Sequence, residues 1–412
     1  MEVSVIVIGD ELLIGQVTDT NSGWIARHLN PYGWSVKSVK VIGDNQDEIF
    51  YAIDEAFKQT DVVLTTGGLG PTKDDITKPT LCQYFGGKLI LDKPTLRNVE
   101  EVIAKRHLTM NPLNELQAMV PSSCRVIQNK VGTAPIMWFE KNGKVLVAMP
   151  GVPFETETMM ECEVIPQLLN RFASNEHIEH RTFIVIDYAE SALAIKLEQF
   201  EKELPSNIHL AYLPKPGVIR LRLTGVGLDA DEIKAEMDIL TKKLDSILGN
   251  KIVCHEDKLI PAILGDKLRQ LKMTLATAES CTGGNIAHQI TSIAGSSDYF
   301  LGSVISYSNN IKQSLLKVPE EVLKNAGAVS EQTVTQMVKG VSELLGVDCA
   351  IATSGIAGPG GGTPLKPVGT VWIAVKKGKQ IVTQCKHFLG TRDRVIDRAT
   401  TEAQIMLLKL MV

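Results

Sequence analysis

The chain has 412 residues, of which 44% are hydrophobic and 22% charged, and its formal net charge is −4. This length is too great for one ordinary hydrophobic core, so two or three domains are expected, and the composition excludes a largely disordered chain. Lysine and arginine are scattered along the sequence, so no extended basic surface and no nucleic-acid partner are expected.

The seven cysteines lie mostly among apolar neighbours and form no CxxC pair. This usage is typical of reduced thiols in the cytosol and not of a disulfide framework. The chain enters the apolar segment "EVSVIVIGD" without a basic region or a cleavage site, and no apolar run approaches the thickness of a bilayer. We therefore expect a cytoplasmic protein with no membrane partner.

Residues 1–170 alternate buried-strand runs with helical patterns. The strand runs are "VSVIVIG", "DVVLTTGG" and "KVLVAMPG", and "QDEIFYAIDEAFKQ" has the spacing of an amphipathic helix. This alternation predicts an α/β domain in which helices cover a parallel sheet.

The segment "DVVLTTGGLGPTKDDIT" runs from a buried strand into a glycine turn that is followed by a lysine and two aspartates. Glycine amides and a lysine suit a phosphate, and adjacent carboxylates suit a divalent metal that bridges it. Another strand end, "GDELLIGQVTDTNS", adds further carboxylates. A cap on the following helix is the alternative role for Asp75. The candidate phosphate ligands are Gly67, Gly68, Gly70 and Lys73, and the candidate metal ligands are Asp10, Asp74 and Asp75.

Residues 171–253 predict a small α+β domain, with strands in "RTFIVIDY" and "IHLAYLPKPGVIRLRLTG" and a long charged helix that ends near "LGN". Residues 254–412 predict a third, α/β domain. Its strands are expected at 274–278, 302–307, 348–354, 368–376 and 380–387, and its last helix at 391–411.

Ser280 follows a short strand and precedes a helical pattern in "ATAESCTGGN". Such a turn lies at the carboxyl edge of a sheet, and the amides of Cys281, Thr282, Gly283 and Gly284 are expected to point at whatever Ser280 attacks. A helix cap is the alternative role for Ser280, and Cys281 is a rival nucleophile.

Lys312 begins a helix after the strand that contains Tyr307, so it is expected at the same sheet edge as Ser280. A lysine acts as a base when it is neutral, and burial lowers its pKa in that direction. A solvated surface lysine is the alternative.

The glycine-rich segment "TSGIAGPGGGTPLKPVGTV" offers many free amides, and "GTRDRVIDRAT" places arginines at the start of the last helix. The loop suits a ribose or a phosphate, and an arginine suits a phosphate. A flexible connector and exposed helix arginines are the alternatives. The candidate ligands are Ser354, Gly355, Gly358, Gly369, Thr370, Arg392 and Arg398.

Six blocks in residues 257–412 together resemble the C-terminal domain of the CinA family, which is also a nicotinamide mononucleotide deamidase family: "TAESCTGG", "AGSSDYF", "YSNNIK", "AGAVSEQTV", "SGIAGPGGGTPLKPVGTV" and "RDRV". The resemblance implies a Ser/Lys amidohydrolase without a cofactor, with Ser280 and Lys312 as the dyad and Tyr307 and Glu279 as catalytic neighbours. The implied substrate is nicotinamide mononucleotide, and the products are nicotinate mononucleotide and ammonia.

Residues 1–165 resemble the three-layer, molybdopterin-binding-like domain of full-length CinA proteins. The resemblance implies hydrolysis of ADP-ribose to AMP and ribose 5-phosphate with a divalent metal ion, and it places Asp75 in the ligand loop. Ile136 departs from the family pattern, in which glycine is common. The middle domain resembles the KH-like domain of these proteins but has no GxxG loop, which nucleic-acid-binding KH modules use. A homodimer is also implied. The alternatives are a pterin-binding protein and an interaction protein of DNA uptake or damage repair.

Overall fold

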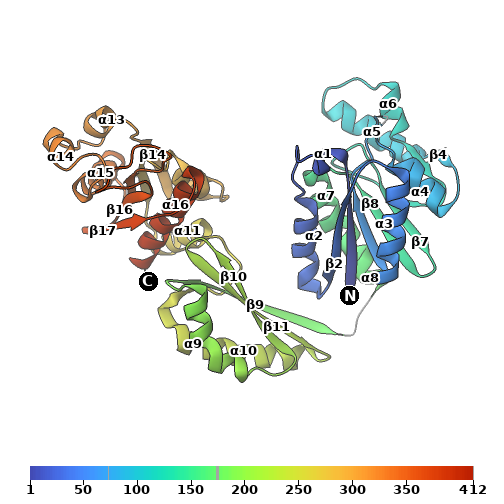
Figure 1. The fold of residues 1–412 in the computed structure, drawn as a ribbon, viewed down its shortest axis with the longest axis horizontal. Helices are drawn as coiled ribbons and strands as arrows, with labels where there is room; N and C mark the ends of the chain where they lie inside the picture. The colour runs from blue at the N-terminus through green and yellow to red at the C-terminus, as the bar shows by residue number, and fades with distance from the viewer. Residues whose placement is uncertain (73, 173–175, 412) are drawn as a thin grey trace. The chain divides into compact units, whose positions relative to one another are not determined.

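The computed structural model describes residues 1–72, 74–172 and 176–411 in two compact units, Met1–Ile178 and Glu179–Val412 (Figure 1). The α/β class is as predicted. The second unit contains both of the domains that the sequence predicts after residue 170. They share a core because Ile184 and Ile186 pack among apolar residues of the chain's last 160 positions, such as Leu264 and Ile405.

The first unit is built on a six-stranded sheet with the order β2-β1-β3-β8-β7-β6. Strands β2, β1, β3 and β8 are parallel, as predicted, whereas β7 and β6 add an antiparallel edge. The strands are β1 (Glu2–Ile8), β2 (Ser35–Ile42), β3 (Val62–Thr66), β6 (Arg125–Ile127), β7 (Ile136–Lys141) and β8 (Lys144–Met149). A separate hairpin pairs β4 (Leu89–Leu91) with β5 (Met119–Pro121).

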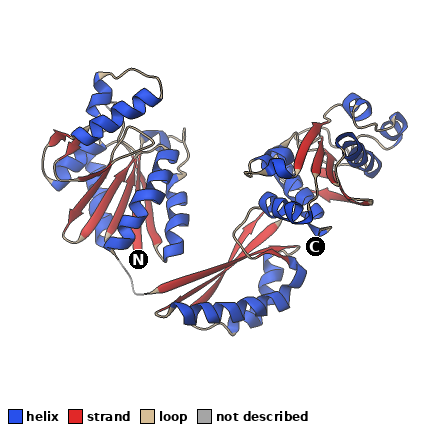
Figure 2. Ribbon diagram, turned by 180° about the vertical axis from the view of Figure 1, so that it is seen from behind, coloured by secondary structure: helices blue, strands red, loops and turns tan. Residues whose placement is uncertain are grey.

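Helices cover both faces of this sheet because its central strands are apolar on both sides (Figure 2). Val5 of β1 faces one core with Ile25 and Leu168, and Ile6 faces the other with Ile53. The helices of the unit are α1 (Asp10–Leu13), α2 (Asn21–Leu29), α3 (Gln46–Gln59), α4 (Thr77–Phe85), α5 (Lys93–Lys105), α6 (Pro112–Leu116), α7 (Pro153–Met159) and α8 (Ile165–Arg171).

Lys78, near the start of α4, is a buried lysine that takes part in no sequence motif singled out above. Its Nζ donates to the carbonyl oxygen of Gln117 at 3.0 Å and to that of Leu116 at 3.4 Å, at the end of α6. Burial lowers its pKa from 10.5 to about 8, although the charge of Asp75 acts in the opposite direction. The charged form of this lysine is therefore destabilised in the folded state.

We expect the unfolding free energy of the first unit to rise by about 3 kcal/mol as the pH rises from 8 to 10.5, because the unfolded chain binds more protons than the folded one in that window. The Lys78→Met variant should lose this pH slope, and variant Lys88→Met, at an exposed lysine, should keep it. Denaturant unfolding followed by tryptophan fluorescence in a Trp372→Phe background measures it, since the other tryptophans, Trp24, Trp34 and Trp138, lie in the first unit. An unchanged slope in Lys78→Met would contradict the assignment.

The second unit begins with a four-stranded sheet of order β10-β11-β9-β12, with α9 and α10 on one face (Figure 1). The elements are β9 (His177–Ile186), α9 (Glu190–Lys202), β10 (Ile208–Lys215), β11 (Val218–Gly227), α10 (Ala230–Leu248) and β12 (Ile252–Cys254). Phe183 and Val185 face these helices, and Ile184 and Ile186 face the opposite way. The side chain of Asp187, just after β9, accepts hydrogen bonds from Lys251, just before β12, and from Lys409, at the end of α16.

The rest of this unit is a five-stranded sheet of order β14-β13-β15-β16-β17 between two helical layers. Strands β14, β13 and β15 are parallel, and β16 and β17 are antiparallel. The strands are β13 (Leu275–Glu279), β14 (Phe300–Ile305), β15 (Cys349–Gly355), β16 (Thr370–Lys377) and β17 (Gln380–His387), each within two residues of its predicted bounds. The helices are α11 (Ile260–Leu271), α12 (Asn285–Thr291), α13 (Asn309–Ser314), α14 (Glu320–Asn325), α15 (Glu331–Leu345) and α16 (Arg392–Lys409).

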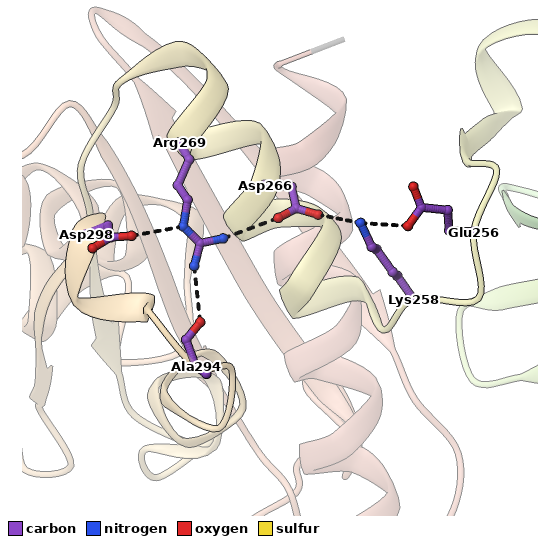
Figure 3. A network of polar contacts seen from close by, with 6 residues as sticks. All are labelled: Glu256, Lys258, Asp266, Arg269, Ala294 and Asp298. Carbon is purple, nitrogen blue, oxygen red and sulfur yellow. Dashed lines mark hydrogen bonds and ion pairs between the residues drawn. The ribbon is translucent and has the colours of Figure 1, made fainter.

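A chain of ion pairs runs along α11 and ties it to its surroundings (Figure 3). Lys258 lies between Glu256 and Asp266, and Arg269 joins Asp266 to Asp298. Arg269 also donates to the carbonyl oxygen of Ala294, just beyond α12. Each exposed pair contributes little free energy, so the network mainly fixes the position of this corner.

None of the helices in the described ranges combines the length and the apolar character that crossing a membrane requires.

Candidate active site

The carboxyl ends of β13, β14 and β15 meet at one edge of the sheet, and Ser280 is the first residue after β13. Its amide donates to the carbonyl oxygen of Thr353 at 3.0 Å, which continues the pairing of β13 with β15. Gly283 and Gly284 then adopt the left-handed φ values of 61° and 100°, which glycine tolerates best. The glycine pair thus allows the chain to reverse sharply before α12, and this turn carries Ser280.

Lys312 lies in α13, which Ser308 caps by accepting a hydrogen bond from the Ile311 amide. The side chain of Lys312 is 1% exposed, and its Nζ lies 3.1 Å from Oγ of Ser280. The same Nζ donates to the carbonyl oxygen of Ser306 at 2.7 Å and to that of Tyr307 at 3.4 Å. The sequence-predicted pair is therefore in contact, and the exposed-lysine alternative is wrong.

Burial lowers the pKa of Lys312, although the neighbouring Cys281 acts in the opposite direction. No carboxylate among the described residues forms an ion pair with this amine. A neutral amine has two N–H bonds and one lone pair. The carbonyl oxygens of Ser306 and Tyr307 can take the two N–H bonds, which leaves the lone pair to accept the Ser280 hydroxyl. The geometry suits a general base.

Cys281, the rival nucleophile, is buried in the wall beside Ser280. Burial raises its pKa to about 12, with a further contribution from the charge of Glu279. The thiol therefore remains protonated near neutral pH, and a protonated thiol is a poor nucleophile.

The Glu279 carboxylate is completely buried and faces the start of α12. It accepts hydrogen bonds from the amides of Gly284, Ile286 and Ala287, and from the Thr282 hydroxyl. Its described hydrogen bonds include none to Ser280 Oγ or to Lys312 Nζ, so the expectation that Glu279 takes part directly in the chemistry is not supported by its contacts.

The predicted row of free amides after Ser280 needs a correction. The amide of Gly283 donates to the carbonyl oxygen of Ser280, and that of Gly284 donates to Glu279. Within the described part of the chain, the amides of Cys281 and Thr282 donate to no carbonyl oxygen, although the Cys281 amide also lies beside its own thiol. These two amides remain available for an oxyanion.

A cavity of about 200 Å³ opens over the Ser280 hydroxyl. The predicted residues that line it are Ser280, Cys281, Tyr307, Lys312, Ser354, Gly355 and Arg392. Its other lining residues, which sequence reasoning did not single out, are Asn309, Ala328, Val329 and Ala357. Asn309 could have been found, since it lies within the "YSNNIK" block between Tyr307 and Lys312. The alanines and the valine carry no chemical signal in the sequence.

Arg392, at the start of α16, is held at this cavity by two contacts. Its Nη1 donates to the carbonyl oxygen of Gly358 at 2.9 Å, and its Nη2 donates to the Tyr307 hydroxyl at 3.2 Å. A guanidinium has five N–H donors, so further donors remain for a ligand. The ring of Tyr307 is 64% exposed at the mouth of the cavity.

Of the ligands predicted in the glycine-rich loop and the last helix, four lie outside the cavity lining: Gly358, Gly369, Thr370 and Arg398. The amide of Gly369 donates to the Ile356 carbonyl oxygen, and that of Thr370 donates to the Pro367 carbonyl oxygen, so both amides hold the glycine-rich loop together. Arg398 donates instead to the carbonyl oxygen of Leu389. Gly358 contributes through its carbonyl group, which positions Arg392.

In the first unit, the glycine turn after β3 packs tightly. Gly67 comes so close to β1 that a Cβ there would lie 2.0 Å from the carbonyl oxygen of Ile8, and the amide of Gly70 donates to Asp75 at 2.8 Å. Asp75 also accepts from the Thr72 amide, so its carboxylate closes this loop and does not cap α4, whose N-cap has no side-chain bond. The amide of Thr77 donates to the carbonyl oxygen of Gly68. Lys73 lies outside the described residues.

Two of the predicted metal ligands, Asp10 and Asp75, accept hydrogen bonds from backbone amides. Asp10 exchanges backbone-to-carboxylate hydrogen bonds with Asp44. The pKa of Asp44 is raised by burial and by the charges of Asp10, Glu11 and Asp75, although its bond from the Asp10 amide lowers it. Among residues 1–72, 74–172 and 176–411, no group of three or more His, Cys, Asp or Glu side chains is placed to hold a metal ion.

A recess of about 70 Å³ lies beside this acidic edge. Oδ1 of Asn21 and Oγ1 of Thr66 are buried there without a partner among the described residues. Unpaired buried polar atoms are costly in a folded protein, so this recess suits a polar ligand.

Comparisons with known proteins match three family descriptions along the chain. "Probable molybdopterin binding domain" matches residues 4–170, "Damage-inducible protein CinA KH domain" matches 180–253, and "CinA C-terminal domain" matches 257–411. A solved structure, the competence damage-inducible protein A from Klebsiella pneumoniae, is 37% identical over 36% of this chain and 93% of its own, with a TM-score of 0.36.

Two curated relatives span nearly the whole chain. A CinA-like protein from Flavobacterium psychrophilum is 42% identical and covers 99% of this chain and 98% of its own length. A CinA-like protein from Cytophaga hutchinsonii is 44% identical over 92% of this chain and 90% of its own. With such relatives and all three domain matches, the chain belongs to the CinA family.

Proposed function

We propose that the C-terminal domain hydrolyses the carboxamide of nicotinamide mononucleotide to nicotinate mononucleotide and ammonia. The observation that carries the proposal is the buried amine of Lys312, 3.1 Å from the Ser280 hydroxyl and without an ion-pair partner among the described residues. A cavity of about 200 Å³ gives a carboxamide-bearing ring access to that hydroxyl. Membership of the CinA family supports the same activity through the resemblance noted above.

In the first half of the reaction, neutral Lys312 takes the Ser280 proton while Oγ attacks the carboxamide carbon. The carbonyl oxygen becomes an oxyanion, and the amides of Cys281 and Thr282 are the donors available to it. Lys312 then returns the proton to the amide nitrogen, the carbon–nitrogen bond breaks, and ammonia leaves an acyl ester on Ser280.

In the second half, a water molecule attacks the ester while Lys312 takes a proton from it. The ester bond to Oγ breaks, and the proton on Lys312 passes to Oγ of Ser280. The nicotinic acid group then gives the second water proton to solvent and leaves as a carboxylate. This sequence needs no cofactor, because one base serves the proton transfers of both halves of the reaction. We assign the substrate phosphate to Arg392, whose remaining donors lie at the cavity.

The direct test is incubation of the purified chain with nicotinamide mononucleotide and measurement of ammonia and nicotinate mononucleotide. Stoichiometric release of both is expected. Release of neither from folded protein would reject the enzyme proposal in favour of a binding or interaction role. Salt-sensitive retention of single-stranded DNA would favour an interaction protein of DNA uptake or damage repair.

We expect the turnover to rise with pH along an acid limb set by Lys312. At low pH the amine is protonated and cannot accept the Ser280 proton, and activity appears as the pH passes through a pKa that burial holds below 10.5. A pH profile of kcat/KM measures this limb. A limb at the ordinary lysine pKa, or none, would exclude Lys312 as the base.

For the first unit we propose ADP-ribose as the ligand, with hydrolysis to AMP and ribose 5-phosphate. The unpaired Asn21 and Thr66 oxygens beside the glycine turn favour a polar ligand with hydroxyl groups at this edge. The resemblance implies a divalent metal. Because the described residues provide no group of three or more His, Cys, Asp or Glu side chains placed to hold one, we derive no step through a metal. Incubation with ADP-ribose, with and without Mg²⁺ or Mn²⁺, tests the proposal. Binding of a pterin in place of ADP-ribose would favour the cofactor-binding alternative.

We further propose that the protein is a cytosolic homodimer. Its free thiols suit a reducing compartment. Light scattering on the purified protein should give twice the chain mass of 45.0 kDa, and a value equal to it would reject the dimer.

A further inference from the structure

We propose that Glu279 is a positioning residue whose buried carboxylate holds the turn carrying Ser280 in register with Lys312. The inference rests on the proposed function for the meaning of that register. It concerns a side chain that the reaction sequence above does not use.

The carboxylate is saturated by donors from the turn and the helix that follows it. Oε2 accepts from the Thr282 hydroxyl at 2.7 Å and from the amides of Gly284 at 3.0 Å and Ile286 at 3.1 Å. Oε1 accepts from the amide of Ala287 at 2.9 Å and from the Thr277 hydroxyl at 3.2 Å. Five donors therefore surround one completely buried carboxylate, and they fix its position relative to the turn and to α12.

The same residue connects the turn to the two strands beside it. The hydroxyl of Thr282 bonds that of Thr353 at 2.7 Å, and the carbonyl oxygen of Thr353 accepts the Ser280 amide. On the other side, the backbone carbonyl of Glu279 accepts the Ser306 amide at 2.8 Å, and the carbonyl oxygen of Ser306 accepts Lys312 Nζ. Glu279 therefore lies between the backbone segments that hold Ser280 and Lys312.

This arrangement separates positioning from proton transfer. Neither carboxylate oxygen is hydrogen-bonded to Ser280 Oγ or Lys312 Nζ in the described contacts. By taking the amides of Gly284, Ile286 and Ala287, the carboxylate also occupies the start of α12, so a substrate phosphate must bind elsewhere in the site.

The test is Glu279→Gln, which keeps the size of the side chain but turns one acceptor into a donor that faces N–H or O–H groups. We expect kcat for ammonia release to fall by about 100-fold, the order found when reacting groups are misplaced by about 1 Å, with KM unchanged. The acid limb of the pH profile should stay in place. Labelling of Ser280 by a sulfonyl fluoride should slow in parallel.

Two further variants keep the test decisive. Glu331→Gln, at an exposed glutamate in the first turn of α15, is the matched control, and its labelling rate should stay near that of the wild type. Thr282→Val removes the hydroxyl that joins Glu279 to Thr353, and it should also lower kcat. It replaces Glu279→Gln as the test if Glu279→Gln does not fold. Circular dichroism confirms which variants are folded.

Near-normal turnover and labelling in folded Glu279→Gln would overturn the inference. Loss of the acid limb would also overturn it, since that result makes Glu279 a proton carrier. If the wild type releases no ammonia and Glu279→Gln still slows labelling, the proposed substrate fails and the positioning role stands.

Discussion

The Lys312→Met variant is expected to lower kcat for ammonia release from nicotinamide mononucleotide by about 10²- to 10⁴-fold, the range that a positioned general base contributes. Methionine fills the buried space but has no lone pair of comparable basicity for the Ser280 proton. The Ser280→Ala variant should be at least as inactive, because no acyl ester can form. A coupled assay for ammonia, with single-turnover measurements, checks both.

Lys324→Met is the matched control, since Lys324 is an exposed lysine paired with Glu320 on the nearby α14. It should retain full turnover. Thermal unfolding should show that Lys312→Met and Ser280→Ala remain folded. Turnover near the wild-type value in folded Lys312→Met would exclude the dyad, whatever the outcome for Ser280→Ala.

The Arg392→Met variant is expected to raise KM for nicotinamide mononucleotide by about 10- to 100-fold, because a hydrogen bond to a charged group contributes about 1.5–3 kcal/mol. Nicotinamide riboside lacks the phosphate, so its KM should change far less. Steady-state kinetics with the two substrates separate loss of the phosphate contact from damage to the site.

Arg398→Met is the control within the same helix, since Arg398 bonds Leu389 and lies outside the cavity lining. Its KM values for both substrates should match those of the wild type. An equal rise of KM for both substrates in Arg392→Met would show that Arg392 only supports the Gly358 loop.

The pairing of Ser280 with Lys312 could be predicted because it follows from local patterns. Each residue follows a predicted strand, and neighbouring parallel strands end at one edge of a sheet. The bounds of the five strands followed from the same apolar runs. Apolar runs do not show in which direction a side chain points. The sequence therefore predicted a catalytic role for Glu279 and could not predict its five hydrogen-bond donors.

The two arginines of α16 illustrate the same limit. Arg398 lies about 9 Å further along the helix than Arg392 and on a different face, so only the first reaches the cavity. The segment "RDRVIDR" does not by itself show which arginine reaches the cavity, because that depends on how the start of the helix packs against the sheet. The amides of Gly369 and Thr370 were likewise unpredictable, because their partners belong to the folded loop.

The acidic edge of the first unit shows how a motif can be right in place and wrong in detail. The sequence located the glycine turn and the carboxylates at the ends of neighbouring strands. Asp75, however, turns back to the amides of Gly70 and Thr72, and Asp10 pairs with Asp44, which no motif included. These choices depend on backbone donors that become available only after the loops close.

Ile184 and Ile186 have a consequence for any attempt to dissect the protein. They fill space among apolar side chains of residues 260–411, while their neighbours Phe183 and Val185 serve the middle domain. A fragment that begins at residue 257 would retain the dyad but would lack Ile184 and Ile186. The apolar side chains that these two isoleucines cover would then be exposed to water. We therefore expect the truncated fragment to be poorly soluble, which would prevent a meaningful measurement of its activity.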